Sequence, residues 1–451
     1  MEKYKKYLKT VPLMYDAAGE SGSEKDISAR TAAYVLAPGM NAFVLWTLEE
    51  ALKSGKKRLY FLARDGYFMY RTAKIFCEEL NIPIECRYLC CSRYSIRIPV
   101  FQYDYEEALE YICRGGIDVN MIKILNRAGL SEAEQTEVME DLDIPYGRAD
   151  TVPYAKLESV KSALRKCGKF KQYLSEHSEE AMPNLRGYME QEGLLEDVPA
   201  AVVDSGWVGS MQKVLNNLLK RIGRKEPLEG YYWGLYELPE DVKRSEYHCY
   251  YFAPEAGMRE KVYFNNCLFE GVFSAPHGMT LRYAQNENRY EPCFEEIDEE
   301  RKKFMEQTEV NLLRYTKCLA GKLRQVSDID SRCAKKAVAG LFALFMGEPT
   351  KEEAEVYGSL SFSDDVLEYG KQQVAAVLTE EELNANHVLN KMLVMFGIKN
   401  EYVKESAWYE GSAARHGKRV GWHLVQYRLY KYLLYIRKGI VWKRSYGKRK
   451  K

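Results

Sequence analysis

Two short segments, each an apolar run that ends in an Asp and a Gly, constrain the fold of this chain most. The first spans residues 57–68 and contains Asp65, and the second spans residues 200–210 and contains Asp204. An amphipathic helical pattern follows each of them. Open α/β proteins carry their polar groups in this way, at the carboxyl ends of buried parallel strands. We therefore expect Asp65 and Asp204, although 139 residues apart, at the same rim of one sheet.

The apolar periodicity around the first segment predicts a βαβ unit. A helix is expected over 40–54, a strand over 58–63 and a second strand over 84–91. Between the strands, apolar residues recur at helical spacing from Met69 to Leu80. Two strands joined by one helix pair in parallel.

The remaining pattern completes an α/β fold with a Rossmann-like parallel-sheet domain over residues 1–290. Residues 104–195 are polar, rich in Glu and Lys and without strand patterning, and are predicted to be a helical insertion. The sheet resumes at 200–204, and strand-like runs follow at 229–236 and 247–253. From about residue 295 the pattern is helical, which predicts a helical region over 291–412.

The net charge of +1 hides an asymmetric distribution. Residues 415–451 hold 13 of the 66 Lys and Arg residues and no acid, which leaves 53 basic against 65 acidic residues, a net charge of −12, elsewhere. Within 423–438, aromatic and aliphatic residues alternate with bases. A basic amphipathic tail over 413–451 of this kind is typical of helices that lie on anionic membranes. RNA binding is a less favoured alternative, and packing on the body is another.

Composition indicates a soluble protein in a reducing compartment. The 11 cysteines form no C-x-x-C pair, and we expect a cytoplasmic protein, with the tail allowing peripheral attachment to the inner face of the cell membrane. The six histidines are scattered, which disfavours a His-based metal site. No signal peptide and no apolar run of the roughly 18 residues needed for a membrane span are evident.

The turn after the first strand, Arg64-Asp65-Gly66, admits three interpretations. It resembles the second half of the D-x-D-G motif of haloacid dehalogenases, in which the first Asp attacks phosphorus and both bind Mg²⁺. Asp65 and Gly66 fit that motif, but Ala63 occupies the position of the nucleophile. Alternatively the turn holds pyrophosphate, as in phosphoribosyltransferases, with a loop over Asp204, Gly206, Gly209 and Ser210 cradling a ribose phosphate. In the third, the Asp caps a helix and the Gly makes a turn.

Five further residues are candidates for the site. Ser92 and Arg93 could bind phosphate, or could cap a helix and lie in solvent. Trp207 could stack on a sugar or a base, or fill the core. Glu270 lies inside an apolar run, where burial would raise its pKa and make it a candidate base, and a salt bridge is the alternative. His277 is a candidate ligand-binding residue in a turn-rich segment.

Taken in order, the segments around Asp65, Ser92, Asp204 and Glu270 to Gly278 resemble the carboxyl-terminal half of predicted hydrolases related to the haloacid dehalogenases. Genes for such proteins lie among those for bacterial capsule, O-antigen and other surface polysaccharides. The resemblance spans roughly residues 35–285. Longer members carry an upstream domain with its own paired Asp motif, which this sequence lacks, so we expect the glycan context to carry over better than the hydrolase activity.

These observations predict a protein of surface-polysaccharide biosynthesis that binds a phosphorylated sugar or a sugar nucleotide at the strand ends. Asp65 and Asp204 would bind Mg²⁺ or a ribose, Arg64 and Arg93 would bind phosphate, and Glu270 would act as a base. A transferase resembling phosphoribosyltransferases or a glycosyltransferase is one alternative. A non-enzymatic, membrane-recruited scaffold of a glycan assembly complex is another.

Overall fold

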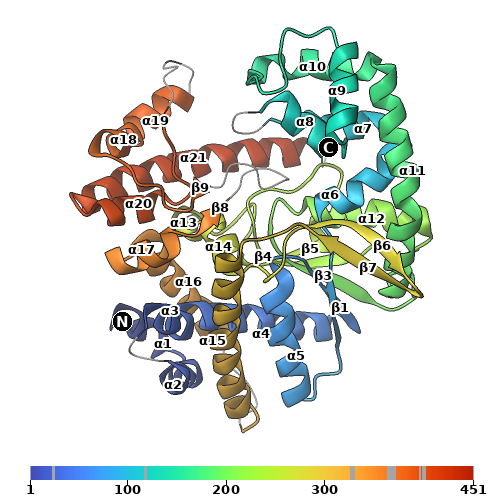
Figure 1. Cartoon of the computed structure of the whole chain (residues 1–451). Helices are drawn as coiled ribbons and strands as arrows, with labels where there is room; N and C mark the ends of the chain where they lie inside the picture. The colour runs from blue at the N-terminus through green and yellow to red at the C-terminus, as the bar shows by residue number, and fades with distance from the viewer. Residues whose placement is uncertain are drawn as a thin grey trace.

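A five-stranded parallel sheet lies at the centre of the protein (Figure 1). The computed structural model describes residues 2–22, 26–115, 119–325, 331–362, 372–395, 398 and 403–449. The strands of the sheet are β1 (Arg58–Leu62), β2 (Glu85–Leu89), β3 (Ala200–Trp207), β4 (Glu229–Leu235) and β5 (Tyr247–Phe252). Their order is β2-β1-β3-β4-β5, and every neighbouring pair is parallel. The predicted α/β fold with a Rossmann-like parallel sheet is confirmed.

The direction in which strands are added to the sheet reverses at β1. The chain first places β2 on one side of β1 and then places β3 on the other. The register aligns Phe61 of β1 with Val203 of β3. Asp65, directly after β1, and Asp204, within β3, therefore lie at the same rim, as expected from the sequence. Ligands of open α/β sheets bind at such a switch point, beyond the carboxyl ends of the strands.

Both faces of the sheet are buried, which explains the nearly continuous apolar strands. Leu59, Phe61 and Val203 point to one face, which is covered by α4 (Ala37–Lys53), α5 (Gly66–Glu79), α15 (Glu299–Leu323) and α16 (Ser331–Gly347). Tyr60 and Val202 point to the other face, which is covered by α11 (Gly168–Gln191) and α12 (Ser210–Ile222).

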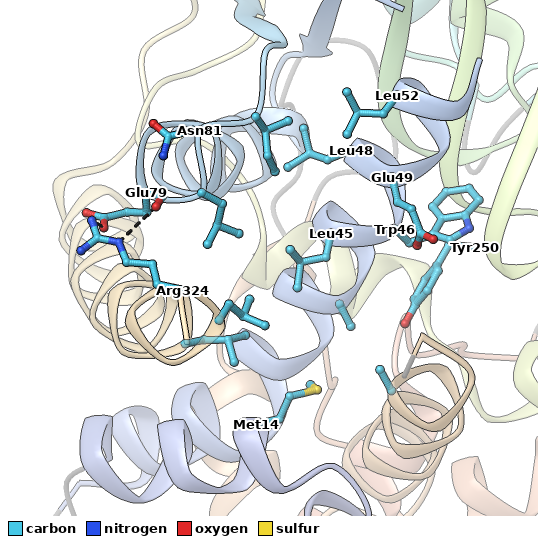
Figure 2. Close-up of a pocket in the computed structure, with 16 residues that line it drawn as sticks. Met14, Leu45, Trp46, Leu48, Glu49, Leu52, Glu79, Asn81, Tyr250 and Arg324 are labelled. Atoms are coloured by element: carbon cyan, nitrogen blue, oxygen red, sulfur yellow. Dashed lines mark hydrogen bonds and ion pairs between the residues drawn. The ribbon is translucent and has the colours of Figure 1, made fainter. Parts of the chain in front are cut away.

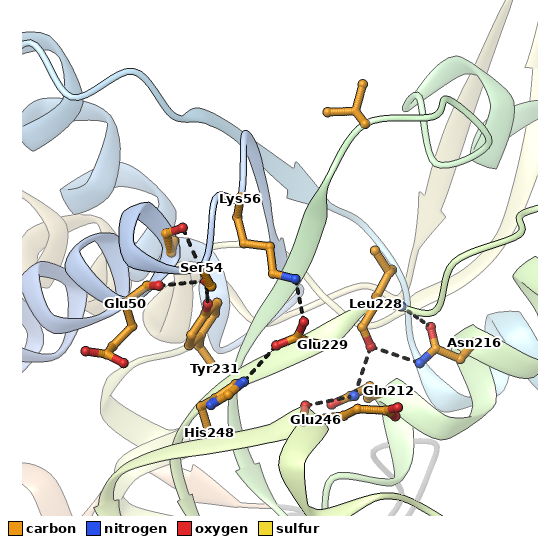
Figure 3. Close-up of polar contacts among 12 residues, drawn as sticks. Glu50, Ser54, Lys56, Gln212, Asn216, Leu228, Glu229, Tyr231, Glu246 and His248 are labelled. Atoms are coloured by element: carbon orange, nitrogen blue, oxygen red, sulfur yellow. Dashed lines mark hydrogen bonds and ion pairs between the residues drawn. The ribbon is translucent and has the colours of Figure 1, made fainter.

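Polar contacts join the strands at the opposite, amino-terminal end of the sheet (Figure 3). Glu229 accepts a hydrogen bond from Lys56 Nζ at 2.5 Å, and its other oxygen lies 2.8 Å from His248 Nε2. The hydroxyls of Ser54 and Tyr231 lie 2.7 Å apart. These contacts link the starts of β1, β4 and β5, and they involve no residue of the carboxyl-end rim.

The predicted helical insertion is present and has a hydrophobic core of its own. It begins at residue 93, earlier than the expected 104, because Ser92 caps a helix directly after β2. Its helices before α11 are α6 (Arg93–Arg97), α7 (Tyr105–Ile112), α8 (Met121–Arg127), α9 (Glu132–Asp141) and α10 (Leu157–Lys166), with 3-10 turns at Ile98–Tyr103 and Tyr154–Lys156. The first half of α11 packs in the insertion core and its second half packs on the sheet. This helix therefore ties the insertion to the body.

The hydrophobic core crosses the domain boundary expected near residue 290. Side chains of α15 and α16 share one core with β1, β3 and α4, so the C-terminal helices complete the α/β body. An antiparallel hairpin, β6 (Thr280–Asn286) and β7 (Arg289–Phe294), also spans the boundary. The sequence analysis missed this hairpin. Its strands are polar and largely exposed, and its turn at Glu287 contains no glycine, the usual hairpin signal.

The tail expected to begin at residue 413 starts inside packed structure. It comprises the end of α20 (Tyr409–His416) and the long helix α21 (Val420–Arg449), which crosses the molecule in Figure 1. Lys431 of α21 is buried, with Nζ 3.3 Å from Glu410 and 3.1 Å from the carbonyl oxygen of Phe264. Tyr427 stacks on Tyr409 at 4.2 Å between ring centroids. The first half of α21 is therefore part of the body.

The remaining elements surround this core. They are α1 (Glu2–Leu8), α2 (Pro12–Ser21), α3 (Ile27–Thr31), a π-helical turn (Ala32–Leu36), a 3-10 turn (Arg244–Glu246), α13 (Met258–Tyr263), α14 (Asn266–Val272), α17 (Lys351–Gly358), β8 (Ser361–Phe362), β9 (Gln372–Gln373), α18 (Glu380–Ala385) and α19 (Val388–Met395). One helical run among the described residues, 27–53, is long and apolar enough to cross a membrane by length and composition. Because 83% of its apolar window is buried inside the protein, it is accounted for as a core helix.

Two truncations test how far the body extends into α21. Removal of residues 415–451 takes away Lys431 and leaves the buried Glu410 carboxylate unpaired. Loss of one partner of a buried ion pair costs about 3–5 kcal/mol, so this chain should unfold at much lower urea concentration. Removal of 439–451 alone, which keeps Lys431 and Tyr427, should retain most of the stability. Equal urea midpoints for the two truncated proteins would contradict this account of the helix.

Candidate functional site

Three carboxylates from separate elements meet at the carboxyl-end rim, at the switch point of the sheet. Asp65 ends the turn after β1, Asp204 lies near the end of β3, and Glu270 lies on α14. Burial raises the pKa of Asp204 to about 7 and that of Glu270 to about 8, and repulsion from Asp65 adds to both shifts. The raised pKa that the sequence predicted for Glu270 is confirmed. The cause is burial beside other acids, and at neutral pH Glu270 holds a proton.

Asp65 lies at the centre of this cluster. Burial raises the pKa of its carboxyl group, and the hydrogen bond from Ser205 and the charges of Arg64, Arg301 and Arg93 oppose that rise. The Ser205 hydroxyl donates to Oδ2 of Asp65. Ser205 of the neighbouring strand therefore orients one oxygen of Asp65, and the positive charges of the three arginines favour the ionised form of its carboxyl group.

The positive charges around the acids come from three different parts of the chain. Arg64 lies in the turn after β1, Arg93 begins α6 after β2, and Arg301 lies in the first turn of α15. Arg93 is exposed, whereas the carboxylates are partly buried. We call Asp65, Asp204, Glu270 and the three arginines the rim cluster. It combines carboxylate oxygens with guanidinium groups, which together suit a divalent cation and a phosphate.

The segment over 204–210 is mostly strand. β3 continues through Trp207, and Gly206 pairs with Gly234 of β4. Gly206 has a φ of +108°, and a Cβ there would lie 2.7 Å from the Gly234 carbonyl oxygen. Gly209 has a φ of +68° and precedes α12, of which Ser210 is the first residue. Close packing accounts for both glycines, and this arrangement differs from the open phosphate loop that the phosphoribosyltransferase interpretation requires.

Trp207 packs within the protein. Its ring lies 5.3 Å from that of Phe264 and 5.5 Å from that of Phe269, between centroids. Its indole Nε1 donates to Oε1 of Glu270. Of the two interpretations of Trp207, the core filler matches this position, and the side chain also orients Glu270.

Ser92 and Gly66 have structural roles at their strand ends. The Ser92 hydroxyl accepts from the Ser95 amide at 2.9 Å and donates to the carbonyl oxygen of Thr280 at 2.6 Å. A Cβ on Gly66 would lie 2.9 Å from the carbonyl carbon of Phe61, so the glycine lets α5 approach β1. Ser92 therefore caps α6 at the rim. Of the two residues, Arg93 is the one whose charge lowers the pKa values of the three acids.

His277 lies beside the rim cluster. Its Nδ1 is 2.8 Å from the Gly278 carbonyl oxygen, which assigns the proton to Nδ1, and Nε2 then accepts from the Tyr88 hydroxyl at 2.8 Å. Burial lowers the pKa of His277, and Arg64 lowers it further. His277 is therefore a neutral ring held by Tyr88, next to the charged cluster.

Sequence reasoning missed three residues of this region. Tyr88 lies within the strand expected over 84–91, where its side chain carries no separate signal. Arg301 lies 236 positions after Asp65, in a helix with many charges, and nothing in the sequence marks it. The position of Ser205 directly after Asp204 at a strand end was the one available signal.

An apolar pocket lies elsewhere in the protein (Figure 2). It has a volume of about 530 Å³ and lies among α4, α5, α15 and α16, with Leu45, Leu48 and Leu319 in its wall. Glu79 and Arg324 form an ion pair at its edge. Because Glu79 ends α5, the pocket is near the opposite end of the sheet from the rim cluster, and it gathers no comparable set of polar groups.

The donors of the rim cluster fit Mg²⁺. Asp65 and Asp204 offer hard carboxylate oxygens, the type that Mg²⁺ prefers. Burial and, after it, the charge of Asp65 raise the pKa of Asp204, and a cation would neutralise the charge of both acids. No family model matches this chain, and no curated protein matches it significantly in sequence.

Proposed function

We propose that this chain binds, and processes, a phosphorylated sugar or a sugar nucleotide at the rim cluster, as a cytoplasmic protein of bacterial surface-polysaccharide biosynthesis. The observation that carries the proposal is the meeting of Asp65, Asp204 and Glu270 with Arg64 and Arg93 at the switch point of the sheet. The surface-polysaccharide context comes from the sequence resemblance alone.

The acids and the arginines of the site suit different parts of the ligand. Asp65 and Asp204 would hold Mg²⁺, which would neutralise charge on a phosphate and orient it. Arg64 and Arg93 supply planar, charged donors for the remaining phosphate oxygens. The exposure of Arg93 places one of these donors where a ligand arrives from solvent.

Glu270 suits the role of a general acid. With a pKa of about 8 it is mostly protonated at neutral pH, and Trp207 holds one of its oxygens. A protonated carboxyl group at this position donates a proton to a leaving oxygen more readily than it removes one. A covalent aspartyl-phosphate step at residues 63–65 is not supported, because Ala63 occupies the position of the nucleophile.

Mg²⁺ and ligand binding test the proposal directly. Asp65→Asn should weaken Mg²⁺ binding at least about tenfold and remove Mg²⁺-dependent binding of nucleotide sugars, because it takes away a charged ligand at the centre of the cluster. Isothermal titration calorimetry of the full chain measures both. The matched control is Asp143→Asn, an exposed Asp of the insertion, which should bind as the unchanged protein does. Unaltered Mg²⁺ and ligand binding by Asp65→Asn would refute the proposed site.

The acid cluster also predicts a pH dependence of stability. Between about pH 4 and pH 8 the folded protein keeps protons on Asp204 and Glu270 that the unfolded chain has released. The metal-free protein should therefore lose stability as the pH rises through this window. Asp204→Asn lacks the contribution of Asp204 to this loss of stability. The unfolding free energy of the variant minus that of the unchanged protein should therefore be about 2 kcal/mol higher at pH 8 than at pH 5. Parallel urea unfolding curves at both pH values measure this difference, and a constant difference would contradict it.

An exposed apolar stripe on α21 supports attachment to a membrane surface. Its members are Trp422, Val425, Leu429, Leu433, Ile436 and Ile440, each more than 40% exposed. At about 100° per residue they fall within an arc of about 80° on the helix. The buried His423, Leu424 and Lys431 occupy a different side. The packing of α21 on the body therefore leaves the stripe in contact with solvent.

Charge complementarity favours an anionic lipid surface as the partner of this stripe. The exposed bases Arg419 and Arg437 accompany it. The sequence 443–451 contains six further Lys and Arg residues. Apolar side chains inserted between acyl chains, with bases at the level of the headgroups, are the arrangement of interfacial helices.

Vesicle co-sedimentation tests this attachment. Leu433→Asp combined with Ile436→Asp should lower binding to vesicles containing phosphatidylserine by about tenfold or more. The reason is that two exposed apolar side chains that would insert into the lipid are lost. Val310→Asp, an equally exposed apolar position on α15, is the matched control and should leave binding unchanged. Added salt should weaken the binding without abolishing it. Equal vesicle binding by the double variant and the control would exclude the stripe as the membrane contact. A shift of single-stranded RNA by the protein, without vesicle binding, would favour nucleic acid as the partner of α21.

A further inference from the structure

A second cluster of ionisable side chains lies outside the rim cluster, where three C-terminal helices meet. Glu380 begins α18, His416 ends α20, and His423 lies in the first turn of α21. Oε2 of Glu380 is 3.7 Å from Nδ1 of His416, and Oε1 is 3.6 Å from Nε2 of His423. One donor atom from each of the three residues lies within 4.8 Å of the other two.

The donor atoms of this cluster are buried and lack hydrogen-bond partners. Oε1 of Glu380, Nδ1 of His416 and Nε2 of His423 each have almost no contact with solvent and no donor or acceptor within reach. The whole His423 side chain is 0% exposed. A buried polar atom without a hydrogen-bond partner destabilises the fold, and three such atoms that face one another indicate a missing common partner.

A fourth side chain orients His423. Nδ1 of His423 lies 2.9 Å from Nε2 of His387, on the side of the ring away from Glu380. At this distance one N–H joins the two rings. With that proton on Nδ1 of His423, its Nε2 presents a lone pair to Glu380 and His416. Metal-binding histidines are held in this way by hydrogen bonds from their other nitrogen.

We propose that Glu380, His416 and His423 bind a divalent transition-metal ion of the Zn²⁺ type. Two imidazole nitrogens and one carboxylate oxygen form a donor set typical of zinc and disfavour Mg²⁺ and Ca²⁺, which take oxygen ligands. Tetrahedral bonds of about 2.0–2.1 Å place donors about 3.3 Å apart. The three donor atoms lie within 4.8 Å of one another, so they need to move together by at most about 1.5 Å when the metal binds. Three protein ligands leave one coordination position for water or another group.

The metal would join three helices that are separate in the sequence. It would fix the start of α21 against α18 and α20, beside the Lys431–Glu410 ion pair that holds the same helix. Arg419 is the one cation that approaches the cluster among the described residues, with Nη1 4.0 Å from Oε1 of Glu380. Because Arg419 is mostly exposed, it can move aside when the metal binds.

Cobalt and zinc titration of the chelator-treated full chain tests the proposal. With Mg²⁺ in excess to occupy the rim cluster, we expect one Co²⁺ per chain with visible d–d absorption. The intense ultraviolet band of a thiolate ligand should be absent, which separates this site from the 11 cysteines. His416→Gln and Glu380→Gln should each weaken binding by about 100-fold or more. His387→Ala, which removes only the orienting partner, should weaken it by about 10–100-fold.

Two controls keep the test decisive. His177→Gln removes a His that pairs with Glu134 in the insertion, and it should bind Co²⁺ as the unchanged chain does. Zn²⁺ should raise the melting temperature of the unchanged chain and of His177→Gln but not that of His416→Gln, whose partly exposed position should spare the metal-free fold. A thiolate band, equal affinity of His416→Gln and the unchanged chain, or no binding at micromolar Co²⁺ would each overturn the proposal.

Discussion

The parallel pairing of β1 with β3 is the constraint on which the rest of the structure depends. The two strands are separated by the whole helical insertion, yet their register is continuous from Arg58 to Phe61. The insertion leaves the sheet at the carboxyl end of β2, and the chain must return to the amino end of β3 on the other side of β1. Helix α11 makes this possible by packing in both cores. Because the pairing also creates the switch point of the sheet, it brings Asp65 and Asp204 to one rim.

The rim cluster follows from that pairing through electrostatics. Burial raises the pKa of Asp204 and of Glu270, and repulsion from Asp65 raises both further. Arginines from other elements reduce it, and a divalent cation with a phosphate ligand would neutralise it further. Trp207 and Ser205 each donate to one of the acids, so the cluster is held in place by hydrogen bonds from a single strand.

Helix α21 connects the two further proposals. One of its sides packs on the body through Lys431 and Tyr427, while another carries the exposed apolar stripe. Its first turn supplies His423 to the proposed metal site. A metal there would fix the start of the helix, and so the direction in which the stripe faces, without any contact with the rim cluster.

Apolar periodicity and turn residues were sufficient to predict the strands, the parallel sheet and the rim position of Asp65 and Asp204, because these depend on local patterns and on the chirality of βαβ units. The hairpin after residue 280 lacked such a pattern. Long-range packing alone decided that the C-terminal helices share the central core, that Arg301 reaches Asp65, and that the scattered His416 and His423 meet at Glu380. These contacts join residues that are far apart in the chain. Burial and charge interactions in the folded structure stabilise them, and a linear sequence does not show which residues will be neighbours.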